Sequence, residues 1–180
     1  MFLIYLLLYW WGDKLLLKNK WLNLFFLLFI LLVDVHLSNS LSRLFHDEFR
    51  IVSRILLFIF VCQVRYDKSA LLYCLYALVG FLGDIYYFGT IGLTVLLFPV
   101  ILYVLRRFPK FYEINLFQLF LVILLVNFFF ETSLYLLAHL YQLITYPIVD
   151  FIAFSLAPSL LYNSLISLLL LLGLSKRNNW

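Results

Sequence analysis

Long apolar runs recur along nearly the whole of this chain, and only short polar links separate them. Of its 180 residues, 66% are hydrophobic and 12% are charged, and a soluble core of this size could not bury so much apolar surface. No polar stretch is long enough to form a separate soluble domain. The sequence therefore predicts an all-α integral membrane protein in which the lipid bilayer covers the remaining apolar surface.

Six of the apolar runs are predicted to cross the membrane as helices. They comprise residues 21–37, 51–64, 70–88, 91–105, 115–137 and 148–174, so a transmembrane domain over residues 21–174 precedes a short tail, residues 175–180. Ten Lys and Arg residues fall on the side of the bundle that would hold both termini, and few fall on the other side. Because basic residues stay on the cytoplasmic side, we expect both termini in the cytoplasm.

Residues 1–20 form a separate N-terminal segment in this prediction. Their apolar part, residues 1–11, would be roughly 16 Å long as a helix, about half of the hydrocarbon thickness. It lacks the basic start and the small-residue cleavage site of a signal peptide. Two interpretations follow: an interfacial helix anchored by Trp10 and Trp11, or an extension upstream of the biological start site.

The stretch from residue 80 to residue 92 interrupts the apolar pattern with Gly80, Asp84, Gly89 and Gly92. On a helix, Gly80 and Asp84 share one face, so a neighbouring helix can approach across the glycine and lie beside the carboxylate. Gly89 and Gly92 bracket a short uncharged link that marks a turn. A tightly packed helical hairpin with an acid near its turn is predicted here.

Several ionisable residues fall inside the predicted spans, and with the predicted topology they gather in the outer half of the membrane. They form an intramembrane polar cluster of Asp34, Arg54, Asp84 and Glu131, with Asp150 at the start of the last span. A lone charge at the bilayer centre costs about 2.5–3.5 kcal/mol, so these groups should face the bundle interior. Either they line a pocket for a ligand, an ion or a partner helix, or Arg54 joins helices by pairing with Asp84 or Glu131. We expect contact between Arg54 and Asp84.

The last span contains Pro158 and Asn163. A proline inside a helix frees a backbone carbonyl, and a side-chain amide in the bilayer interior needs a partner. This helix is therefore expected to be kinked and closely packed.

The sequence holds no pattern typical of a catalytic, cofactor or metal site. No Ser or Cys nucleophile is matched with a His base, and neither a zinc-protease motif nor a phosphate-binding loop is present. Cys62 and Cys74 lie apart in apolar runs and are interpreted as small buried hydrophobic residues. The basic residues are dispersed instead of forming the patch that nucleic-acid binding requires. We expect no enzyme, no cofactor, no metal and no nucleic-acid partner.

Two motifs in this order and spacing resemble those of a known family. They are Gly80-x3-Asp84-x4-Gly89-x2-Gly92, which runs into Leu97-Phe98-Pro99, and Leu156-Ala-Pro158-Ser-Leu-Leu-Tyr-Asn163. Together with the six-span pattern, they resemble the bacterial rod shape-determining protein MreD family over about residues 21–174. The resemblance implies Gly80, Asp84, Gly89, Gly92, Pro158 and Asn163 as signature residues with a structural or partner-binding role.

The resemblance also implies a function and partners. It implies a non-enzymatic, multi-pass component of the bacterial cytoplasmic membrane in the cell-elongation machinery. This component would act as a scaffold or regulator with MreC and, directly or indirectly, with the peptidoglycan synthases of lateral wall growth. The family's fold is thought to be similar to that of the substrate-binding subunits of energy-coupling-factor vitamin transporters. That similarity supplies an alternative function, vitamin binding at the outer acidic cluster, but residues 21–35 lack the expected small-xxx-small pattern.

Overall fold

The computed structural model describes residues 20–46, 48–88 and 92–178, and this part of the chain is helical without strands. Five helices precede the last span: α3 (Lys20–Leu44), α4 (Ile55–Tyr66), α5 (Leu71–Phe88), α6 (Thr94–Arg107) and α7 (Leu116–Leu140). The last span consists of α8 (Ile148–Phe151), a π-helical turn (Ile152–Leu156) and α9 (Ala157–Asn178). A short 3₁₀ helix, Pro109–Tyr112, links α6 to α7. Within the described residues, the predicted number of six helices is confirmed; residues 1–19 and Gly89 lie outside them.

In the part of the chain that the structure describes, three helices are long and apolar enough to cross a membrane: Trp21–Leu44, Leu116–Leu140 and Ile148–Ser175. Their outward faces carry large hydrophobic side chains, such as Phe29 on α3 and Leu125 on α7, which are about half exposed. Such faces suit contact with lipid. A helix also satisfies its own backbone N–H and C=O groups, as the bilayer interior requires.

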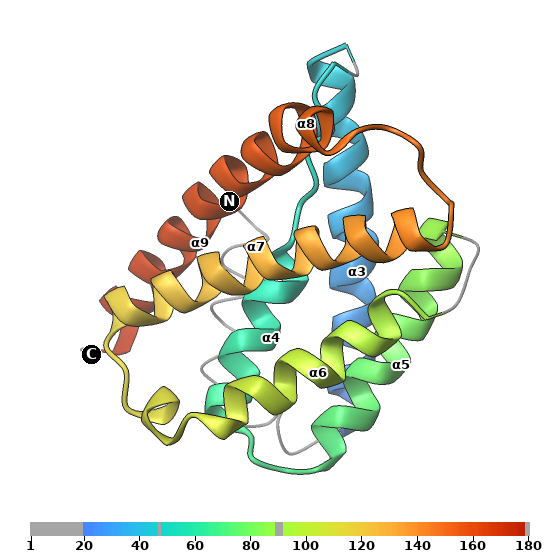
Figure 1. Ribbon diagram of the computed structural model, residues 1–180. Helices are drawn as coiled ribbons and strands as arrows, with labels where there is room; N and C mark the ends of the chain where they lie inside the picture. Colours follow the sequence, from blue (N-terminus) through green and yellow to red (C-terminus); the bar gives the residue numbers. More distant parts are fainter. Residues whose placement is uncertain (1–19, 47, 89–91, 179–180) are drawn as a thin grey trace.

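Helix α4 lies at the centre of the bundle. Its residues from Ile55 to Cys62, and also Val64, are buried, and it contacts α3, α6, α7 and α9. Figure 1 shows α4 behind α6 and α7, which cross in front of it. A helix surrounded on all sides is expected to be apolar around its whole circumference, which accounts for the uninterrupted run of hydrophobic residues in its sequence.

The predicted second span is shorter as a helix than its apolar run. Helix α4 has 12 residues, or about 18 Å of length against a hydrocarbon core of about 30 Å. It begins at Ile55 instead of residue 51, and residues 51–54 are not helical. We call residues 50–54 the strap: it connects the loop after α3 to the start of α4. In the hydrocarbon region of a membrane, non-helical backbone is tolerated only where the protein itself supplies hydrogen-bond partners for its N–H and C=O groups.

Candidate functional site

The carboxylate of Asp84 caps the start of a neighbouring helix. Asp84 lies on α5 and is fully buried, and it accepts backbone N–H bonds from the beginning of α6: Gly92 at 2.9 Å, Thr94 at 2.7 Å and Val95 at 3.2 Å. The residue that precedes α6, Leu93, has no side chain able to cap it. The first N–H groups of a helix have no partner within the helix, so Asp84 satisfies them from outside.

Two glycines allow this cap to form. A Cβ added to Gly80 would meet the backbone of Thr94 and Val95 at 3.0 Å, so α5 and α6 can approach this closely only without a side chain there. The Thr94 hydroxyl lies 2.7 Å from both the Gly80 carbonyl oxygen and Asp84 Oδ1. Gly92 has a φ of +121°, a conformation that other residues rarely adopt. The predicted close approach at Gly80 is therefore confirmed.

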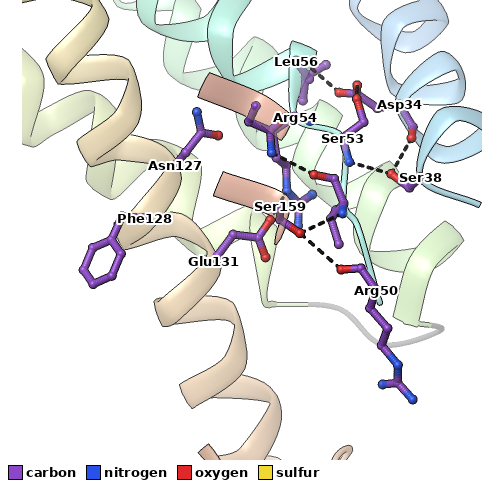
Figure 2. Close-up of polar contacts among 12 residues, drawn as sticks. Asp34, Ser38, Arg50, Ser53, Arg54, Leu56, Asn127, Phe128, Glu131 and Ser159 are labelled. Atoms are coloured by element: carbon purple, nitrogen blue, oxygen red, sulfur yellow. Dashed lines mark hydrogen bonds and ion pairs between the residues drawn. The ribbon is translucent and has the colours of Figure 1, made fainter. Parts of the chain in front are cut away.

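Asp34 caps the start of α4 in the same way. Its side chain, on α3, is buried and accepts the N–H groups of Ile55 at 3.0 Å and Leu56 at 2.8 Å, together with the Ser53 hydroxyl at 2.7 Å. Ser38 is one turn further along α3 and accepts the Ser53 backbone N–H at 2.8 Å. Figure 2 shows these side chains turned towards the strap. Both short helices of the bundle thus begin on a carboxylate that another helix supplies.

The final helix holds the other edge of the strap. Asn163 accepts the Arg54 backbone N–H and donates to the Val52 carbonyl, both at 2.8 Å. Ser159 accepts the Val52 N–H at 2.9 Å and donates to the Arg50 carbonyl at 3.2 Å. These four bonds pair strap backbone with side chains of α9, as Figure 2 shows for Ser159 and Arg50.

Pro158 provides one more contact for the strap. Since proline has no N–H, the carbonyl one turn before it, at Phe154, loses its usual helical partner. That carbonyl accepts the backbone N–H of Arg50 at 2.8 Å. The helix around Phe154 opens into the π-helical turn Ile152–Leu156, an irregularity common where a proline or an inserted group disturbs a helix. The π-helical turn lies directly before Pro158, and the carbonyl that the proline frees accepts a strap N–H; the kink itself stays a prediction.

Arg54 pairs with Glu131 and not with Asp84, so the expected contact between Arg54 and Asp84 is wrong. Arg54 Nε donates to Glu131 Oε1 at 2.6 Å, and both side chains are largely buried. The Arg54 guanidinium also lies 5.1 Å from the centre of the Phe130 ring. Asp84 cannot serve as the partner because its oxygens face the start of α6. The interpretation that Arg54 joins helices is supported, with Glu131 as its partner.

The cluster of ionisable residues is divided into separate contacts in the structure. Asp34 and Asp84 cap different helices, Glu131 pairs with Arg54, and Asp150 lies exposed at the start of the last span. Among the described residues, no three His, Cys, Asp or Glu side chains could hold a metal ion together. The carboxylates of Asp34, Asp84 and Glu131 are therefore occupied by contacts within the bundle, which differs from an outer cluster of acids open to a ligand.

At the strap's exposed end, Arg50 lies over the Tyr146 ring, 5.3 Å from its centre. Burial raises the pKa of the Tyr146 phenol, while the positive charge of Arg50 lowers it in part. This contact connects the loop after α3 with the loop that precedes the last span.

Sequence reasoning missed the hydroxyl groups of this site and a second polar network. Ser38 could have been found from its position one turn after Asp34 on the same face; Ser53 and Ser159 carry no such signal. The second network lies between α3, α4 and α5, where Gln63 donates to Asn23 at 2.9 Å and accepts the Tyr76 hydroxyl at 2.9 Å.

Comparison with known proteins gives consistent results. The family model described as "rod shape-determining protein MreD" matches residues 18–176. The chain is 32% identical, over 148 residues, to the cell shape-determining protein MreD of Streptococcus pneumoniae (strain ATCC BAA-255 / R6), an alignment that covers 81% of this chain and 89% of the relative. No solved structure matches the chain.

Proposed function

The chain belongs to the rod shape-determining protein MreD family, and from this membership we propose that it is a non-enzymatic membrane scaffold of the bacterial cell-elongation machinery. It would act with MreC and, directly or through MreC, with the peptidoglycan synthases that extend the lateral wall. Family membership supports a role in cell shape, and the apolar helices support a place in the membrane. The single observation that carries the proposal is the family match over nearly the whole chain.

The polar contacts of the bundle favour a scaffold over a catalyst. A catalytic acid or base must reach a substrate, whereas Asp34, Asp84 and Glu131 are occupied by backbone N–H groups or by Arg54. These contacts join α3 to α4, α5 to α6, and α7 to the strap, and Asn163 joins α9 to the strap. A partner that recognises the outer surface of the bundle would therefore meet a defined arrangement of helices.

The proposed topology has both termini in the cytoplasm and six membrane crossings. The supporting observation is the distribution of basic residues, which include Arg65, Arg106 and Arg107 at one end of the bundle. Single cysteines introduced in a cysteine-free background can test it. A cysteine at Lys110 should react with a membrane-impermeant maleimide only after the cells are opened, whereas one at Gln142 should react in intact cells.

Co-purification tests the function. The tagged protein, extracted in mild detergent, should recover MreC in near-equal amount, and a variant with Asp84→Ala should recover less because α6 loses its cap. Recovery of no MreC by the folded parent protein would contradict the proposal. A retained vitamin-like molecule in place of MreC would instead favour the alternative, a substrate-binding subunit of an energy-coupling-factor transporter.

A further inference from the structure

The end of α6 lies against the link between α4 and α5. Arg106 donates to the backbone carbonyls of Asp67 at 3.1 Å and Ser69 at 2.8 Å. The 3₁₀ helix that follows α6 belongs to the same end, since Lys68 Nζ lies 4.3 Å from the centre of the Tyr112 ring. Figure 1 shows these segments together in the lower part of the view. We call the four basic residues Lys68, Arg106, Arg107 and Lys110 the basic cluster.

The positive charge of the basic cluster is not neutralised by carboxylates. In the two segments that meet here, residues 65–69 and 105–113, five residues are basic and two are acidic. One of the acids, Asp67, uses both carboxylate oxygens within its own link, where they accept the Ser69 N–H at 2.7 Å and the Ser69 hydroxyl at 3.0 Å. Within the ranges that the structure describes, no carboxylate forms an ion pair with a member of the basic cluster. This end of the bundle therefore carries net positive charge.

An exposed apolar stripe of α6 leads directly to the basic cluster. Four of its large side chains are about half exposed and recur at helical spacing: Leu96, Val100, Tyr103 and Val104. Arg107 follows on the same face, because it lies four residues after Tyr103 and three after Val104. The buried residues of α6 occupy the opposite face. An apolar chain that contacts the stripe would thus end beside a positive charge.

The members of the basic cluster have different positions. Arg106 is held by the two carbonyls and by the Tyr73 ring, 5.0 Å from its guanidinium, and contributes mainly to the local potential. Arg107 and Lys110 are exposed, so both can reach a ligand from outside. Guanidinium and ammonium groups bind phosphate oxygens well. Phe108, which is 61% exposed, adds an aromatic side chain of the kind enriched at membrane interfaces.

We propose that the basic cluster binds the head group of an anionic phospholipid, whose acyl chain lies along the exposed stripe of α6. The phosphate contacts Arg107 and Lys110, and the other two members supply positive potential. Charge complementarity selects a lipid with net negative charge, because a zwitterionic head also carries a cation that the cluster repels. The adjoining stripe selects a lipid over a soluble phosphate. The proposal requires that the chain lies in a membrane, and it does not depend on the proposed partner proteins.

Native mass spectrometry of the full chain in detergent tests the proposal. Titration with dioleoyl phosphatidylglycerol, and separately with dioleoyl phosphatidylcholine, gives the Kd of the first bound lipid. We expect phosphatidylglycerol to bind at least about tenfold more tightly, since each basic residue near a membrane surface contributes about a fivefold preference. Glycerol phosphate carries the head group without acyl chains and should not displace the lipid at equal concentration.

Substitutions of exposed residues locate the binding. Arg107→Gln and Lys110→Gln should each lower the preference for phosphatidylglycerol by about three- to fivefold. Arg43→Gln is the matched control, because Arg43 is an exposed arginine in the last turn of α3, at the opposite end of the bundle (Figure 1), and it should leave the preference unchanged. Helical circular dichroism establishes that each variant is folded.

Several results would overturn the proposal. The parent protein alone does so if it binds both lipids equally, or if glycerol phosphate displaces the lipid at equal concentration. The variants do so if the folded double variant Arg107→Gln with Lys110→Gln keeps the parent's preference, or if Arg43→Gln lowers it as much as Arg107→Gln does.

Discussion

Replacing Asp84 with Asn tests whether the carboxylate holds α5 and α6 together. One Asp84 oxygen accepts the N–H groups of Gly92 and Val95, and the other accepts the N–H of Thr94. An Asn side chain has one acceptor oxygen and one NH2 group, so it cannot serve both sets of donors. In either orientation at least one backbone N–H at the start of α6 loses its acceptor.

The magnitude follows from the burial of this site. A buried donor left without a partner costs about 1–3 kcal/mol, and Asp84 is fully buried while Thr94 is buried. We therefore expect Asp84→Asn to lower the free energy of unfolding by about 1–3 kcal/mol if Asn keeps the pair of donors, and by roughly twice as much if it keeps the single donor. Asp84→Ala should cost more, since no acceptor remains.

Unfolding in mixed micelles, followed by helical circular dichroism as the fraction of denaturing detergent rises, measures this free energy. Asp150→Asn is the matched control, because Asp150 is an exposed acid on the last span and its substitution should change stability by about 0.5 kcal/mol or less. MreC recovery is the second readout. If Asp84→Asn unfolds no more easily than Asp150→Asn and still recovers MreC, the carboxylate is not the cap that the geometry indicates.

Three further tests probe neighbouring contacts in the same assay. Gly80→Ala should cost about 1–3 kcal/mol, because its Cβ meets α6 backbone at 3.0 Å, whereas Gly83→Ala meets a flexible leucine side chain at 3.3 Å and should cost less; equal losses would contradict this. Asn163→Leu leaves two strap backbone groups without partners and should cost about 2–6 kcal/mol, so a loss near zero would show that the strap is held otherwise. Glu131→Gln alone should cost about 3–5 kcal/mol, and adding Arg54→Gln should restore part of it; simple additivity of the two changes would show that the pair is not coupled.

Some of the signature positions were predictable from local pattern. Gly80 and Asp84 lie four residues apart, and helical geometry alone places them on one face towards a neighbour. Pro158 has no backbone N–H, so it leaves a carbonyl of the preceding turn without its helical partner wherever this helix lies in the bundle. These predictions depend on distances along one helix, which the sequence specifies.

Partners across the bundle were not predictable in this way. Arg54 could have reached Asp84 or Glu131, and nothing in the sequence separated the two. The structure decided in favour of Glu131, because the start of α6 occupies Asp84 and the start of α4 occupies Asp34. The strap was also not predictable: Ile51 and Val52 read as the start of the apolar run of α4. In the structure, side chains of α9 accept the backbone N–H groups of Val52 and Arg54, and residues 51–54 are not helical.

The sequence by itself determined that this chain has helices apolar enough to enter a membrane, that its described part forms six helices, and which family it resembles. The apolar helices follow from apolar surface and from periodicity, both of which add up locally along the chain, whereas the family resemblance follows from two motifs and their spacing. The tertiary structure decided what each buried polar group does. Asp84 stands out in the sequence as an acid within an apolar run. In the structure its carboxylate accepts the first backbone N–H groups of α6. Its role depends on a helix end ten residues away that only packing across Gly80 brings within reach.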